Sequence, residues 1–151
     1  MESFNTLQEV ISYAIEREEE SYRLYMRASG MVEAVSSRKM LEEMAAQELV
    51  HKQLLQRMDT TTAQFCSTEK VPDLKIGDYL VDVKYRDDMT YQEILIFAMK
   101  MEEKAAQLYA SAHSLTSDER ILKMLEMLVN EEKKHKFNIE ALYNDKVLAE
   151  N

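Results

Sequence analysis

The sequence contains little of what interrupts or cross-links a chain. Its 151 residues include two glycines, one proline, one cysteine and no tryptophan. A single cysteine, Cys66, excludes an intrachain disulfide and every Cys-x-x-Cys metal or redox site. The scarcity of glycine and proline favours long helices. Any site chemistry must therefore use Glu, Asp, His or Tyr.

Long hydrophobic runs and an excess of positive charge are also missing. No stretch of about 18 apolar residues occurs, and the start MESFNTLQEV lacks the features of a signal peptide. We therefore expect a cytoplasmic protein. The formal net charge of -9 would repel nucleic-acid phosphates and an anionic membrane surface, so we expect neither as a partner.

What the chain does have is typical of an all-α protein. Hydrophobic residues make up 46% and charged residues 31% of the chain, with abundant Glu, Lys, Leu, Met and Ala. This length suits one domain, residues 1–151, with a substantial core.

Apolar residues at 3.6-residue spacing predict four helices, at about residues 6–29, 37–59, 89–113 and 117–145. The first two helices form a hairpin over about 6–59, and the last two form another over about 89–145. The crossover between them, about 60–88, contains Pro72 and Gly77 and is too long for a tight turn. We interpret Cys66, in this crossover, as incidental and not as a redox thiol.

The two hairpins are copies of each other. A shift of 84 residues, which moves Glu18 onto Glu102, lays TLQEVISYAIEREEESYRLYMRA over TYQEILIFAMKMEEKAAQLYASA. Without a gap, KMLEEMAAQELVHK then falls on KMLEMLVNEEKKHK. The chain is therefore a duplicated helical hairpin in which each Glu-x-x-His of one copy has a counterpart in the other.

Acidic and imidazole side chains interrupt the apolar stripes of these helices. Near its midpoint, the stripe of the first helix contains Glu18 and that of the third contains Glu102. The stripe of the second helix contains Glu48 with His51, and that of the fourth contains Glu132 with His135. Helix midpoints meet in a bundle whichever way the helices run, so we expect these six side chains to converge. In the alternative interpretation, some of the glutamates lie at the stripe edge and reach solvent.

Four carboxylates in a low-dielectric interior repel one another unless they are protonated or neutralised, and two divalent cations balance their charge. One Glu from each of two helices plus one Glu-x-x-His from each of the other two is the ligand set of a dinuclear site in a helical bundle. We therefore predict six metal ligands: Glu18, Glu48, His51, Glu102, Glu132 and His135.

These residues resemble the ferritin-like superfamily and, within it, the rubrerythrin-like branch. AIEREEESYRLY and AMKMEEKAAQLY look like the first and third helices of that branch, and LVNEEKKHKFNIEALY looks like its closing Glu-x-x-His helix. The resemblance implies an antiparallel four-helix bundle with a left-handed crossover, a di-iron centre and a homodimer. It also implies that Glu48 and Glu132 bridge the irons, with Glu18 and His51 completing one site and Glu102 and His135 the other.

The chain departs from the rubrerythrin pattern in two respects. Rubrerythrins proper have a further carboxylate three residues after the third-helix Glu, where this chain has Ala105, which leaves a more symmetric site similar to that of bacterioferritins. Rubrerythrins also usually end in a rubredoxin domain, and this chain has no cysteine pair. Electrons are therefore expected from a separate protein such as a rubredoxin.

Carboxylates with imidazole can hold both ferrous and ferric iron, so we expect two iron ions, with zinc or manganese as substitutes. The leading expectation is a di-iron oxidoreductase that reduces hydrogen peroxide or dioxygen. One alternative is a ferroxidase that takes Fe(II) as its substrate, and another is a metal-binding bundle without redox chemistry.

Two tyrosines lie two turns beyond the stripe glutamates of the first and third helices. Tyr25 follows Glu18, and Tyr109 follows Glu102 at the same interval. Because helical side chains lean toward the N-terminus, these hydroxyls are expected to hydrogen-bond to ligand carboxylates. The alternative is core packing with each hydroxyl bonded elsewhere.

Overall fold

The computed structural model describes residues 6–65 and 85–150, which are almost entirely helical and contain no strand. The elements are α1 (Leu7–Ser29), α2 (Val35–Phe65), α3 (Tyr91–Ala112), a short 3-10 helix η2 (His113–Leu115) and α4 (Glu119–Glu150). The predicted all-α class is confirmed.

The largest differences from the predicted bounds are at the carboxyl ends of α2 and α4, which continue past residues 59 and 145. Neither extension contains glycine or proline, and each residue added to an existing helix gains a hydrogen bond without a new nucleation cost. Most of the predicted crossover, including Cys66 and the expected left-handed path, lies outside the described residues.

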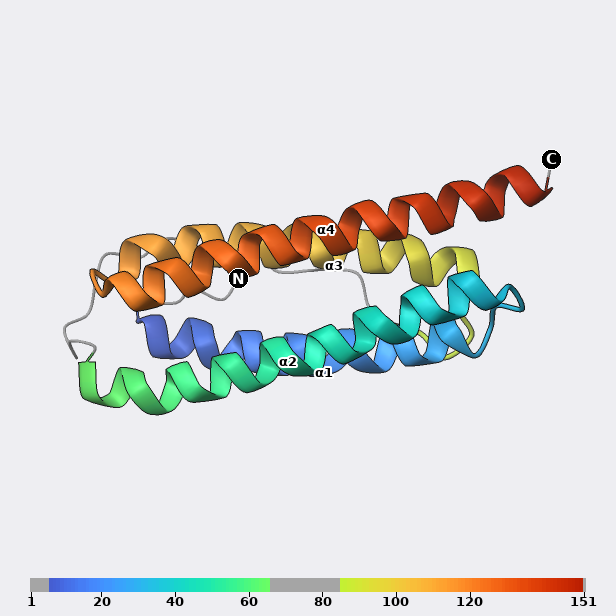
Figure 1. Ribbon diagram of the computed structural model, residues 1–151. Helices are drawn as coiled ribbons and strands as arrows, with labels where there is room; N and C mark the ends of the chain where they lie inside the picture. Colours follow the sequence, from blue (N-terminus) through green and yellow to red (C-terminus); the bar gives the residue numbers. More distant parts are fainter. Residues whose placement is uncertain (1–5, 66–84, 151) are drawn as a thin grey trace.

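The helices form a bundle of two hairpins, α1 with α2 and α3 with α4 (Figure 1). Figure 1 shows α1 and α4 running in one direction and α2 and α3 in the other. Contacts are densest within each hairpin, and the hairpins meet mainly where α1 packs against α3. Every packed pair is thus antiparallel, which confirms the predicted antiparallel four-helix bundle.

The hydrophobic core is divided into two clusters by a polar layer. One cluster includes Ile11, Leu55 and Leu125, and the other includes Leu24 and Leu41. Along each helix, the stripe glutamate lies in sequence between residues of one cluster and residues of the other. The layer therefore crosses the bundle near its middle, with apolar side chains on both sides that exclude water.

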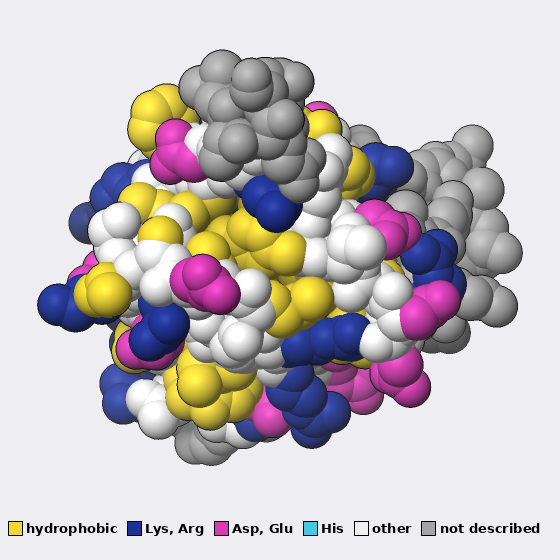
Figure 2. Space-filling model, turned by 90° about the vertical axis from the view of Figure 1, so that its right-hand side faces the viewer, with side chains coloured by type: hydrophobic (Ala, Val, Ile, Leu, Met, Phe, Trp, Pro, Cys, Tyr) yellow, Lys and Arg dark blue, Asp and Glu magenta, His cyan; other side chains and the backbone are white. Residues whose placement is uncertain are grey.

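One end of the bundle carries hydrophobic side chains on its surface. Figure 2 shows this end, where hydrophobic groups gather in the centre and charged groups surround them. Met31, between α1 and α2, and Val35, the first residue of α2, are exposed. Arg27, near the end of α1, donates hydrogen bonds to the Tyr85 hydroxyl and the Asp87 carbonyl, so the segment before α3 is held against this end.

None of the helices in the described part of the chain combines the length and the low charge that a membrane span requires.

Candidate metal centre

The polar layer consists of the six predicted ligands, each at most 4% exposed. Within residues 6–58 and 85–146, whose side chains are described, these are the buried carboxylates and imidazoles. They belong to the helix stripes because residues three or four apart share a helix face. The structure therefore buries all six, and the alternative in which some glutamates reach solvent is wrong.

The six side chains form two overlapping groups of possible ligands. One group is Glu18, Glu48, His51 and Glu132, and the other is Glu48, Glu102, Glu132 and His135. Within each group, one ligand atom per residue lies within 4.8 Å of the others. Since Glu48 and Glu132 occur in both groups, the arrangement provides two cation positions with two shared carboxylates.

Several of these ligand atoms lack a conventional partner. The Oε2 atoms of Glu18, Glu48 and Glu102, the Oε1 atom of Glu132 and Nδ1 of His51 are buried without a hydrogen-bond partner in the described part of the chain. His51 Nδ1 lies 3.2 Å from Glu132 Oε1, yet the two atoms form no hydrogen bond. Unpaired buried polar atoms are costly, and atoms that converge without bonding to one another are suited to a common cation. The residues fit a dinuclear metal site.

Electrostatics at the centre also favour a cation. Burial raises the pKa of Glu132 well above its ordinary value, and repulsion from Glu102 and Glu18 raises it further. A carboxyl group in this position retains its proton unless positive charge replaces that proton. Binding of a divalent cation at this centre would therefore release protons.

The two tyrosine hydroxyls bond to the stripe glutamates of the opposite hairpin. Tyr109 donates to Glu18 Oε1 at 2.6 Å, and Tyr25 donates to Glu102 Oε1. Burial raises the pKa of both tyrosines well above the ordinary value, and the neighbouring Glu102 (for Tyr25) and Glu18 (for Tyr109) contribute. The hydroxyls remain donors and fix one oxygen of each carboxylate, which leaves the other oxygen directed at the centre.

The outer nitrogens of the two histidines face residues that the sequence analysis did not identify. His135 Nε2 lies 2.6 Å from Gln47 Oε1, and His51 Nε2 lies 4.0 Å from Glu131 Oε2. Gln47 and Glu131 occupy equivalent positions of the duplication, each directly before a shared glutamate. Their equivalence in the alignment of the two copies is the sequence signal that could have pointed to Gln47 and Glu131.

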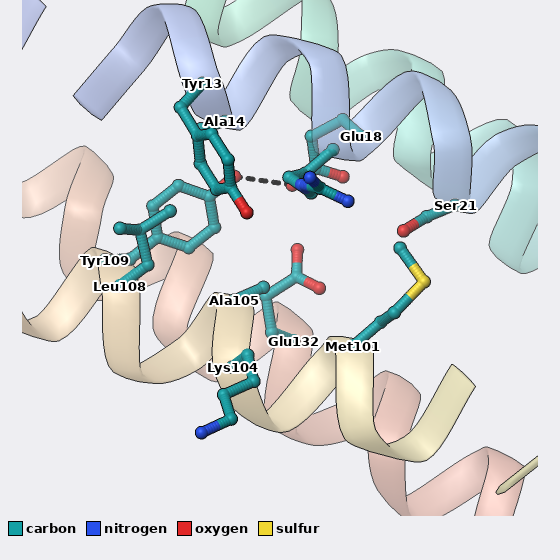
Figure 3. A pocket seen from close by; sticks show the side chains of 11 residues that line it. Tyr13, Ala14, Glu18, Ser21, Met101, Lys104, Ala105, Leu108, Tyr109 and Glu132 are labelled. Atoms are coloured by element: carbon teal, nitrogen blue, oxygen red, sulfur yellow. Dashed lines mark hydrogen bonds between the residues drawn. The ribbon is translucent and has the colours of Figure 1, made fainter. Parts of the chain in front are cut away.

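A small cavity reaches the centre between α1 and α3 (Figure 3). Its volume of about 20 Å³ has room for one water molecule. Glu18 and Glu132 line its inner side, Ala105 lines its wall, and the half-buried side chains of Tyr13 and Arg17 border it. The small side chain of Ala105 therefore leaves space directly beside two of the ligands.

Comparison with known proteins places the chain in a family. The model of the rubrerythrin family matches residues 9–143, which include all six residues of the centre. The chain belongs to the rubrerythrin family. The resemblance that the helix motifs suggested is thereby confirmed. A comparison with curated proteins found no match.

Two solved structures share the fold of this rubrerythrin-family chain. A Thermotoga maritima protein, proposed to be a ferritin-like diiron-carboxylate protein, has a TM-score of 0.75 and 20% identity, and the match covers 97% of this chain and 99% of that one. A hypothetical protein from Pyrococcus furiosus has a TM-score of 0.71 and 21% identity, with 92% and 89% covered. The ferritin-like fold of this chain is therefore established.

Proposed function

We propose that this chain binds two iron ions at the six buried ligands and reduces hydrogen peroxide or dioxygen with electrons from a separate donor protein. The observation that carries the proposal is the set of buried carboxylate and imidazole atoms that converge without hydrogen-bond partners. Membership of the rubrerythrin family and the fold shared with a proposed diiron-carboxylate protein support iron as the metal.

Two ferrous ions bound there would supply two electrons, which reduce one hydrogen peroxide and two protons to two water molecules. Glu48 and Glu132 would be shared by both ions, because each belongs to both ligand groups. Tyr25 and Tyr109 would hold the terminal carboxylates Glu102 and Glu18 in place. The cavity beside Ala105 marks the side from which a small molecule such as peroxide would approach Glu18 and Glu132.

We also propose that the electron donor is a small redox protein such as a rubredoxin, because a single cysteine cannot form a four-cysteine iron site within this chain. A homodimer is the assembly we propose, and analytical ultracentrifugation would test it. A sedimentation coefficient of a monomer at micromolar concentration would contradict this part of the proposal.

Metal content tests the proposal directly. Elemental mass spectrometry of protein purified without chelators should find about two irons per chain, and Glu48→Ala combined with Glu132→Ala should remove them. Anaerobic stopped-flow mixing of the diferrous protein with peroxide should then show fast oxidation, with the metal-free protein as the control.

The alternatives predict different outcomes of the same experiments. Turnover of excess Fe(II) with accumulation of protein-bound ferric mineral would identify a ferroxidase instead. Retention of zinc in preference to iron, with no consumption of peroxide, would identify a metal-binding bundle without redox chemistry. Absence of any metal, or an unchanged amount in the double variant, would end the metal hypothesis.

A further inference from the structure

We propose that Gln47 and Glu131 make the two cation positions unequal, so that the Glu18–His51 position binds a divalent cation more tightly and fills first. The inference rests on the proposed metal site. It assigns to Gln47 and Glu131 the function of positioning and tuning the histidine ligands from the side away from the metal. Gln47 acts through a hydrogen bond to His135, and Glu131 acts through its charge, 4.0 Å from His51 Nε2.

The types of ligand do not distinguish the two positions. The duplication pairs Glu18 with Glu102, Glu48 with Glu132 and His51 with His135, so each position offers the same donor atoms. Each terminal carboxylate also accepts a hydrogen bond from one tyrosine. A chemical difference between the positions must therefore come from the side chains around the ligands.

That layer differs at the outer nitrogens of the histidines. In both rings Nδ1 faces the carboxylates of the centre, with His135 Nδ1 at 2.5 Å from Glu48 Oε1 and His51 Nδ1 at 3.2 Å from Glu132 Oε1. Nε2 is thus the outer atom in both. The Nε2 atom of His135 faces the neutral amide of Gln47, and the Nε2 atom of His51 faces the carboxylate of Glu131.

These contacts cross between the hairpins, because Gln47 is on α2 and His135 on α4, whereas Glu131 is on α4 and His51 on α2. Gln47 and Glu131 are also the residues directly before the shared ligands Glu48 and Glu132. The duplication therefore places one residue of each copy near the ligand histidine of the other. One of these residues is an amide at 2.6 Å and the other a carboxylate at 4.0 Å.

A carboxylate behind an imidazole changes what the ring offers to a cation. Glu131 Oε2 is too far from His51 Nε2 to accept its proton, but it adds negative charge near the Glu18–His51 position, which attracts a cation. The Gln47 amide oxygen orients the His135 ring through a hydrogen bond and adds no charge. Lys134 Nζ lies 3.4 Å from Glu131 Oε1 but is 69% exposed, so solvent screens much of its opposing charge. Removal of such an outer partner typically costs about 10–100-fold in metal affinity.

The test measures which position zinc occupies when one equivalent is added to metal-free protein. Anomalous scattering at the zinc edge gives the occupancy of each position directly, and zinc has no redox chemistry that could alter the result. We expect the Glu18–His51 position to be favoured by about tenfold. Direct occupancies are needed because repulsion between two bound cations would separate two binding steps even in a symmetric site.

Substitutions at Gln47, which is exposed, and at Glu131, which is half-buried, supply the matched variants. Glu131→Gln and Gln47→Glu should each bring the two occupancies close to equal, because each makes the outer partners alike. The combined swap, Gln47→Glu with Glu131→Gln, should reverse the preference. Gln53→Glu, which adds the same charge on the exposed face of α2, should leave the preference unchanged.

The outcomes separate this inference from the proposed function. Equal occupancies in the wild type, or a preference that the swap does not reverse, would overturn the inference. If the site still binds two zinc ions in that case, the metal proposal remains supported. A chain that binds no zinc and no iron would overturn both.

Discussion

The carboxyl group of Glu132 is 1% exposed and lies beside those of Glu18 and Glu102. Burial and these neighbours hold its pKa well above the ordinary value of 4.5 when no cation is present. The folded chain then keeps a proton that the unfolded chain releases above about pH 4.5. The contribution of Glu132 to the stability of the metal-free protein therefore decreases as pH rises from its unfolded toward its folded pKa.

At this scale we predict that Glu132→Gln stabilises the metal-free protein at neutral pH. Glutamine has a similar shape and no ionisable proton, so it avoids the pH-dependent loss, and a gain of about 1–3 kcal/mol is expected. Urea denaturation in a chelator at pH 5 and pH 7.5 measures the gain, which should be larger at the higher pH. Glu43→Gln, on the exposed face of α2, serves as the control and should change little.

A gain that is equal at both pH values would show that Glu132 does not carry a raised pKa in the folded chain. The same variant should bind metal poorly, since an amide cannot bridge two cations as a carboxylate does. Stability of the metal-free state and affinity for metal should thus change in opposite directions.

At the scale of elements, the contact between α1 and α3 encloses the cavity that reaches the centre. The hairpins meet mainly through these two helices, and the cavity between them is bounded by the small side chain of Ala105 and by the ligands Glu18 and Glu132 (Figure 3). Ala105 is half-buried, so a larger side chain at this position can fill the cavity without replacing a ligand.

We therefore predict that Ala105→Leu slows the oxidation of the diferrous protein by peroxide while the iron content stays near that of the wild type. A decrease of about tenfold corresponds to about 1.4 kcal/mol in the barrier, a modest cost for obstructed access. Stopped-flow oxidation and elemental analysis provide the two measurements, and Ala110→Leu, on the exposed side of α3, is the control. An unchanged oxidation rate in Ala105→Leu would place the access route elsewhere.

At the scale of the whole molecule, the polar layer separates two hydrophobic clusters and involves all four helices. A cation held by all four helices is bound by the folded chain and hardly at all by the unfolded chain, so it stabilises the entire bundle. Free ligand at 100 times its dissociation constant adds about 2.7 kcal/mol.

For a chain of this size we predict that one such cation raises the midpoint of thermal unfolding by about 5–11 °C. Differential scanning calorimetry of the metal-free protein, with and without added zinc, measures the shift. The Glu48→Ala and Glu132→Ala double variant should show no shift. A shift of equal size in that variant would mean that zinc binds outside the centre.

The sequence by itself determined the helical class, the duplicated hairpin and the six residues of the centre. These features depend on local periodicity, because residues three or four apart share a helix face whatever the rest of the chain does. Glu18 and His135 were therefore identifiable before any contact was known.

The tertiary structure alone decided the contacts between helices. The crossed bonds from Tyr109 to Glu18 and from Tyr25 to Glu102, the approach of Gln47 to His135 and the cavity beside Ala105 depend on axial register and on crossing angles. Packing of side-chain ridges into grooves sets those quantities over the whole bundle. Periodicity within one helix carries no information about them. The convergence of the six side chains could therefore be predicted from sequence, whereas which outer side chain reaches which of the six could not.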